Sequence, residues 1–369
     1  MILVTGGSGF VGQEVVAELI RLNQRVRVLV RNPEKASKLP FASQVELARG
    51  DALKPETLPA ALVGVSAVIH LVGFIIETSH ISYEQGHFEA TRNVLEAAKQ
   101  AGVTRWVQMS AAGTRPNARS RYHQTKWQAE EFVRASGLEW TIFRPSLIYG
   151  YDKRDRLLNL LKRVLSPPVD LLTLYSIGLI NGGEPLVQPV SVKEVARCFA
   201  AAPGTRDSVG KTFDLVGPVA MHWREMVTKI NAGLGQMTVC QKFPLLLVFR
   251  AAAALAAAFF IIIMAALALP GGTSIWVLLL VVLGFVGLAI LSSFSPVAIR
   301  PSTLIFFMPG EFLIRISEVW NQVSPRGPHP SEVLKMSVED NVGDPRPAAE
   351  VFGYVPEAFE EGVRRIVGE

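Results

Sequence analysis

The chain has 369 residues, of which 49% are hydrophobic, and a formal net charge of +5. No block of lysine and arginine occurs, which argues against a nucleic-acid partner, and the mild positive charge suits an anionic cofactor or a membrane surface. The only two cysteines, Cys198 and Cys240, lie outside any CxxC pattern or histidine cluster, so the sequence predicts neither a disulfide framework nor a metal site.

Short β-rich runs alternate with amphipathic helical stretches from the first residue onwards. Strands are expected at 2–5, 25–30, 45–48, 67–71, 105–109 and 140–144. Helices are expected at 12–22, 83–102, 126–136 and 191–203. A last strand at 212–215 could join the same sheet. This alternation predicts βαβ units and therefore an α/β fold of Rossmann type with a doubly wound parallel sheet.

A glycine-rich turn follows the first strand directly and opens the first helix. Its residues are Thr5, Gly6, Gly7, Ser8, Gly9, Phe10, Val11 and Gly12. Gly6 and Gly9 would let the backbone turn sharply and approach a pyrophosphate at the N-terminus of the helix. Gly12 would let the helix pack closely on the sheet. The turn therefore predicts a dinucleotide site.

The end of the second strand bears on which dinucleotide binds. NAD-binding domains usually carry an acidic residue there, to hold the ribose hydroxyls. This chain has Arg31, whose guanidinium could accept a 2′-phosphate and stack on adenine. NADP(H) is therefore preferred and NAD(H) remains possible. The other interpretation is that Arg31 is a solvated surface arginine.

A second group of chemically active residues follows the fifth strand. Tyr122 and Lys126 are four residues apart and would share one helix face, and Ser110 ends the preceding strand. A lysine ammonium beside the phenol would lower its pKa, so that the tyrosine could exchange a proton with a hydroxyl or carbonyl. The serine hydroxyl could orient the same oxygen. These three residues are the candidate catalytic set.

Over about residues 1–235 the sequence resembles the short-chain dehydrogenase/reductase superfamily in its extended or atypical branch. The shared segments are Thr5 to Gly12, Gly50-Asp51, His70 to Gly73, Thr91 to Val94, Ser110, Tyr122 with Lys126, Arg144 to Ser146, and Gln188 to Val190. The resemblance implies that Asp51 contacts adenine and that Val72 and Gly73 line the ribose. It also implies that Pro145, Ser146 and Leu147 lie beside the nicotinamide, and that Tyr122 and Lys126 contact the cofactor.

Within this branch the chain is most similar to the group related to the nucleotide-binding accessory subunit of respiratory complex I. Arg121 to Lys126 and the distal Asp340-Asn341-Val342 carry that similarity. The resemblance implies an NADPH held as a structural or regulatory ligand within a membrane protein complex. The intact Ser-Tyr-Lys set favours a different function, an NADPH-dependent oxidoreductase or epimerase acting on a quinone, an isoprenoid, a pigment precursor or a lipid-linked sugar.

Residues 251–299 contain no charged side chain. The apolar runs 251–269 and 275–291 flank a Pro-Gly-Gly turn, and each comes close to the ~20 residues that a bilayer-spanning helix needs. The alternative is a pair of buried helices in a large core. Lys242, Arg250 and Arg300 flank the hairpin, so both of its ends are expected in the cytoplasm. No signal-peptide pattern opens the chain. We therefore expect an integral protein of the inner, cytoplasmic membrane with both termini on the cytoplasmic side.

The resulting domain plan has four parts. Residues 1–216 form the nucleotide-binding domain and 217–250 begin a small C-terminal region. The hairpin occupies 251–299, and a membrane-proximal C-terminal segment occupies 300–369. In that segment 304–308 and an amphipathic stretch at 311–320 are expected to lie along the membrane or to pack on the nucleotide domain.

Overall fold

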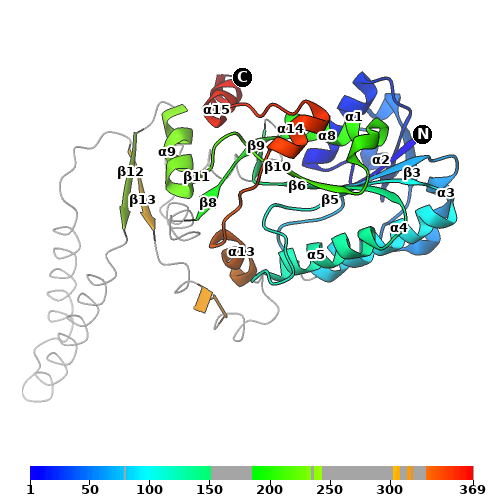
Figure 1. The fold of residues 1–369 in the computed structure, drawn as a ribbon, viewed down its shortest axis with the longest axis horizontal. Coiled ribbons are helices and arrows are strands. Elements are labelled where there is room, and N and C mark those ends of the chain that lie inside the picture. Colours follow the sequence, from blue (N-terminus) through cyan, green and yellow to red (C-terminus); the bar gives the residue numbers. More distant parts are fainter. Residues whose placement is uncertain are drawn as a thin grey trace, which may run out of the picture.

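The computed structural model describes residues 1–78, 80–150, 185–233, 237–242, 302–307, 314–315, 317–318 and 330–368. Its centre is a parallel sheet of seven strands in the order β10-β6-β5-β4-β1-β2-β3 (Figure 1). These strands are β1 (Ile2–Thr5), β2 (Val26–Val30), β3 (Glu46–Arg49), β4 (Ala67–His70), β5 (Arg105–Met109), β6 (Glu139–Pro145) and β10 (Lys211–Leu215). The predicted Rossmann-type α/β fold with a parallel sheet is confirmed.

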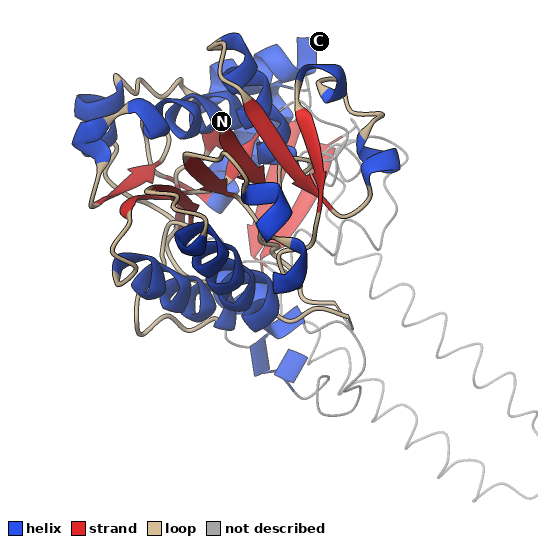
Figure 2. Ribbon diagram, turned by 90° about the vertical axis from the view of Figure 1, so that its right-hand side faces the viewer, coloured by secondary structure: helices blue, strands red, loops and turns tan. Residues whose placement is uncertain are grey.

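Helices cover both faces of this sheet (Figure 2). One face carries α1 (Phe10–Arg21) and α8 (Val192–Ala201), and the other carries α3 (Pro59–Leu62), α4 (Ala90–Gln100) and α5 (Arg121–Arg134). The remaining helices are α2 (Pro33–Ala36), α9 (Trp223–Gly233), α13 (Pro330–Ser337), α14 (Arg346–Phe352), α15 (Phe359–Gly368), and the short η1 (Ala42–Gln44), η2 (Pro55–Thr57), η3 (Glu84–Glu89), η4 (Ala202–Gly204) and η5 (Arg206–Ser208).

The alternation of side chains along the central strands builds one hydrophobic core on each side of the sheet. Val4 of β1 packs into the core beneath α1 and α8, whereas its neighbour Leu3 packs into the core beneath α4 and α5. The same alternation places Phe143 and Ile142 of β6 in opposite cores. Each such side chain contributes roughly 1.5–3 kcal/mol by leaving water. Strands buried on both faces are typical of parallel sheets.

Strand pairs outside the main sheet complete the described chain. They are formed by β7 (Ile148–Tyr149) with β9 (Val190–Ser191), β8 (Leu186–Val187) with β11 (Met221–His222), and β12 (Met237–Lys242) with β13 (Ser302–Phe307). The parallel pairing of β12 with β13 was not predicted. It makes residues 302–307 a strand, whereas the sequence pattern indicated a segment lying along a membrane or packed on the nucleotide domain.

The predicted boundaries of the helices and of the strands of the main sheet agree with the structure to within two residues, except at the start of α5. Each strand of the main sheet begins and ends within one residue of its predicted range. Helix α5 begins at Arg121 rather than 126, because the Ser120 side chain accepts the N–H of His123 and caps it. The predicted helix 83–102 is continuous over residues 83–100, but its first part, η3, has π rather than α geometry.

The expected integral membrane location is not supported and is corrected here. Among the residues that the structure describes, no helix is long and apolar enough to cross a bilayer. The longest of them, α5, has 14 residues and carries charged side chains, whereas about 20 apolar residues are required. The predicted hairpin at 251–299 lies outside the described residues.

Candidate functional site

The glycine-rich turn between β1 and α1 has a geometry that only glycine can supply. Gly6 has a φ of +74°, and a Cβ there would lie 2.9 Å from the carbonyl carbon of Leu71. A Cβ on Gly12 would lie 2.2 Å from the Gly6 carbonyl oxygen, so helix and turn are in direct backbone contact. Gly9 is exposed and starts α1 without a side-chain cap. The positive end of the helix dipole therefore faces outward, as an anion site requires.

Thr5 and His70 lie beneath this turn. Both are fully buried, and Thr5 Oγ1 is 2.8 Å from His70 Nδ1. The imidazole stacks on Trp106 at 5.4 Å between ring centroids. Burial, aided by the positive charge of Lys126, lowers the pKa of His70 to about 3, so the ring is neutral. The side chain of Thr5 therefore supports the turn from below, and only its backbone belongs to the loop surface.

The residues predicted for the adenine end lie at the carboxyl ends of two neighbouring strands. Arg31 follows β2 and is exposed, and within the described part of the chain it forms no ion pair. Asp51 follows β3, which pairs with β2, and its Oδ1 accepts the N–H of Leu53 at 3.1 Å. Both side chains are thus at the same edge of the sheet as the glycine turn.

Lys126 and Gly73 meet at the next strand end. The Lys126 side chain is buried, and its Nζ donates to the Met109 carbonyl at 3.3 Å. A Cβ on Gly73 would lie only 2.9 Å from that nitrogen, so the segment after β4, including Val72, lies close to α5. Burial lowers the pKa of Lys126 to about 8, against the opposing effect of Glu130.

Tyr122 is half-buried and contacts three other aromatic rings. Tyr83, His87 and His123 each meet it edge-on, at centroid distances of 5.8, 5.0 and 5.0 Å. Burial raises the pKa of Tyr122 to about 12. The sequence-based expectation that Lys126 lowers this pKa is wrong in this structure, because the lysine amine is directed to the Met109 carbonyl and desolvation governs the phenol.

Ser110 lies at the end of β5 and is also buried. Its hydroxyl donates to Thr114 Oγ1 at 3.4 Å, and Thr114 Oγ1 is 3.3 Å from His123 Nδ1. His123 is 4% exposed, and burial lowers its pKa to about 4. Serine, threonine and histidine therefore form a continuous polar chain inside the protein.

The segment predicted to lie beside a nicotinamide joins the ends of β5, β6 and β10. The Pro145 carbonyl accepts the N–H of Ala112 at 2.8 Å. The N–H of Ser146 donates to Leu215 at 3.1 Å, and its hydroxyl donates to the Gln188 carbonyl. Leu147 is half-buried and accepts the N–H of Val190 at 2.9 Å.

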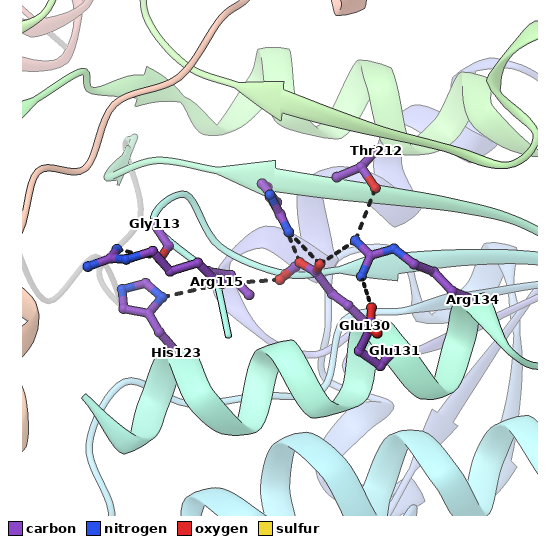
Figure 3. A network of polar contacts seen from close by, with 10 residues as sticks. Gly113, Arg115, His123, Glu130, Glu131, Arg134 and Thr212 are labelled. Carbon is purple, nitrogen blue, oxygen red and sulfur yellow. Dashed lines mark hydrogen bonds and ion pairs between the residues drawn. The ribbon is translucent and has the colours of Figure 1, made fainter. Parts of the chain in front are cut away.

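A buried ion-pair network fixes α5 on the sheet, and sequence analysis missed it (Figure 3). Glu130 is completely buried, and its carboxylate accepts from Arg144 at 2.8 and 2.6 Å and from Arg134 at 2.6 Å. Because Arg144 belongs to β6, the network ties the helix of Tyr122 and Lys126 to the strand that ends at Pro145. The i, i+4 spacing of Glu130 and Arg134 was the only signal in the sequence.

The C-terminal residues 330–344 lie over the start of α5, as Figure 1 shows for α13. Glu332 accepts the N–H of Arg121 at 2.7 Å, and Glu339 accepts from the Arg115 guanidinium at 2.5 Å. Asn341 donates to the Ala112 carbonyl at 3.2 Å. These contacts cross more than 200 positions of sequence, so no local pattern could have predicted them.

Comparison with known proteins agrees with this geometry. Residues 6–160 match a family model described as NAD(P)H-binding. The first part of this chain is thus similar to NAD(P)H-binding domains. The predicted resemblance to short-chain dehydrogenases/reductases, and to an accessory subunit of complex I, is confirmed.

Two relatives of this chain are named as different kinds of protein, a complex I subunit and an azoreductase. The mitochondrial NADH dehydrogenase (ubiquinone) 1 alpha subcomplex subunit 9 of Arabidopsis thaliana is 32% identical over 222 residues, which cover 58% of this chain and 53% of that protein. An NAD(P)H azoreductase of Xenophilus azovorans is 28% identical over 243 residues, 64% of this chain and 74% of that one. The chain thus spans about half the length of the complex I relatives that it matches.

Among solved structures, an NADPH-dependent quinone oxidoreductase of Escherichia coli complexed with NADPH is similar with a TM-score of 0.62. The alignment covers 99% of both chains at 16% identity. At this identity the similarity shows the fold alone.

Proposed function

We propose that this chain binds NADP(H) as a structural or regulatory ligand and serves as an accessory subunit of a membrane electron-transfer complex related to complex I. The observation that carries the proposal is a contrast within the site. The glycine turn presents an outward-facing anion site, whereas Tyr122 packs against three rings and burial raises its pKa to about 12. A phenol of that pKa is poorly matched to proton transfer at neutral pH. The complex I relatives supply the kind of partner.

The cofactor would follow the carboxyl edge of the sheet. Its pyrophosphate would lie over Gly6 and Gly9 at the start of α1, where Phe10 and Val11 contribute backbone N–H groups. Adenine would lie towards Asp51, and the nicotinamide ribose towards Val72, Gly73 and Lys126. The nicotinamide would lie beside the segment 145–147. The same proposal places the end of the nucleotide-binding domain at residue 216.

Arg31 supports the choice of NADP(H) over NAD(H). Its guanidinium is exposed at the end of β2, where the ribose 2′ position is expected, and no described carboxylate neutralises it. A 2′-phosphate would gain a charge-assisted, bidentate contact there.

Purification of the tagged protein at its natural abundance, after mild detergent extraction of the source cells, tests the accessory role. A stable large assembly that contains electron-transfer subunits and carries bound NADP(H) is the expected result. A free monomer or dimer that oxidises NADPH with added quinone would contradict it.

The second candidate is an NADPH-dependent oxidoreductase acting on a lipophilic substrate. It is favoured by the presence of Ser110 at the end of β5 and of Tyr122 and Lys126 on α5, and by the azoreductase among the relatives. In that case Tyr122 would exchange a proton with the substrate oxygen and Ser110 would orient it. For Ser110 to do so, its hydroxyl must leave Thr114 when substrate binds.

A further inference from the structure

His87 stands out as a buried, doubly bonded histidine beside the proposed nicotinamide site that the sequence did not single out. It lies in the π-helix η3, a rare local geometry that is frequent at functional sites. The preceding Gly86 is required for the packing there, because a Cβ on it would lie 2.0 Å from the Phe74 ring. The His87 side chain is 1% exposed and faces Tyr122 edge-on.

The two ring nitrogens of His87 bind two different segments. Nε2 is 3.0 Å from the Phe74 carbonyl, and Nδ1 is 2.9 Å from Thr125 Oγ1. Nε2 also lies 3.4 Å from the N–H of Phe74, so it contacts this residue in either neutral tautomer, as donor to the carbonyl or as acceptor from the N–H. The Thr125 hydroxyl, which also lies 2.9 Å from the Arg121 carbonyl, is the hydrogen-bond partner of Nδ1. Burial, followed by the positive charge of Lys126, holds the pKa of His87 well below its ordinary value, so the ring stays neutral through the physiological range.

The two bonded segments carry the residues proposed to hold the nicotinamide ribose. Phe74 directly follows Gly73, and Thr125 directly precedes Lys126. A Cβ on Gly73 would lie 2.9 Å from Lys126 Nζ and 3.4 Å from His87 Cδ2. His87 therefore lies at the point where the segment after β4 approaches α5, and its two bonds set the separation of Gly73 and Lys126.

We propose that His87 is a positioning residue for the nicotinamide half of the cofactor, because it ties the segment after β4 to helix α5. This inference rests on the proposed NADP(H) binding. It requires no change of charge on His87 and no contact between His87 and the ligand. It predicts that loss of the two His87 hydrogen bonds weakens binding of the whole dinucleotide but not of its adenine half.

Titration with NADPH and with adenosine 2′,5′-bisphosphate, which lacks the nicotinamide half, tests this inference on the full chain. His87→Ala should weaken NADPH about tenfold, the scale of one or two buried hydrogen bonds, and leave the bisphosphate within about twofold. His87→Gln, whose amide can still donate to the Phe74 carbonyl, should recover part of the loss. Thr125→Val should show a smaller loss of the same kind, and exposed His80→Ala should show none.

The outcomes separate the two proposals. If the wild-type chain binds neither nucleotide, the proposed function fails and this inference fails with it. If the wild type binds both, equal losses of NADPH and bisphosphate, or no loss of either, overturn the role of His87 and leave the proposed function standing. Should His87→Ala fail to fold in a thermal scan, His87→Gln and Thr125→Val decide by the same ratio of the two affinities.

Discussion

The two ends of the candidate site differ in composition, since one is formed by backbone atoms and the other by side chains. The glycine turn uses backbone alone, and Gly9 at its tip is exposed. The other end is formed by polar side chains. Among them, Ser110, Lys126 and His87 are buried and hydrogen-bonded to other parts of the protein. Exposed backbone groups in a turn remain free to bind a ligand. Buried side chains that are hydrogen-bonded within the protein contribute mainly to its stability. The difference favours a protein that holds a nucleotide over one that turns a substrate over rapidly.

The largest expected effect concerns the frame beneath the reaction end. Glu130→Ala leaves Arg134 and Arg144 without their buried partner, and should lower the free energy of unfolding by about 3–5 kcal/mol. Glu131→Ala is the matched control on the same helix, since that side chain is 55% exposed and should cost less than about 1 kcal/mol. Urea unfolding monitored by circular dichroism compares them, and equal losses would show that the network does not fix α5.

At the nucleotide end, Arg31→Ala should weaken NADPH binding by about 1.5–3 kcal/mol, the scale of a charge-assisted hydrogen bond, and leave NADH nearly unchanged. Arg25→Ala, at the opposite end of β2, is the control and should affect neither cofactor. Calorimetric titration with both cofactors measures the ratio. Equal losses for NADPH and NADH in Arg31→Ala would refute the 2′-phosphate assignment.

Two glycines of the same turn should respond differently. Gly12→Ala forces a Cβ to within 2.2 Å of backbone, so it should cost about 1–3 kcal/mol of stability despite the better helix propensity of alanine. Gly9→Ala meets only the Gly6 carbonyl, at 3.2 Å, and its φ of −77° suits any residue, so the change should be within about 0.5 kcal/mol. Thermal unfolding of both variants checks the difference, and a Gly9→Ala loss as large as that of Gly12→Ala would contradict it.

The smallest expected effect for each residue is the dependence of folding stability on pH, which arises from buried histidines. His70, His87 and His123 are buried and neutral, with pKa values lowered to about 3, well below 6.5 and about 4, respectively. Below pH 6.5 the unfolded chain binds protons that the folded one does not, so their contribution is complete above pH 6.5 and is lost as the pH falls towards the folded values. Each contributes a slope of at most about 1.4 kcal/mol per pH unit.

Urea midpoints at pH 7.5, 6.5 and 5.5 measure that slope. Stability should fall less between the first two than between the second and the third, and His70→Asn should remove one histidine's share of the fall. A stability that rises on acidification would contradict the buried, neutral state of these rings.

Local patterns predicted the frame of the site but not its interior. The strands and the glycine turn follow from alternation and from the backbone freedom of glycine, which neighbouring residues alone determine. The ring contacts of Tyr122, the Glu130 network and the contacts of Glu332 depend on segments that meet only in the folded chain. For the same reason the predicted shift of the Tyr122 pKa had the wrong sign, since the i, i+4 spacing indicates proximity but says nothing of desolvation.

The central claim is that the nucleotide acts as a structural ligand rather than as a substrate. Complex assembly in cells carrying Tyr122→Phe or Gly9→Val tests it most directly. The first variant removes only a hydroxyl, and the second projects a side chain from an exposed turn into the pyrophosphate position with little effect on the fold. Assembly should survive Tyr122→Phe and fail with Gly9→Val. Equal failure of the two variants would contradict the account and favour an enzyme.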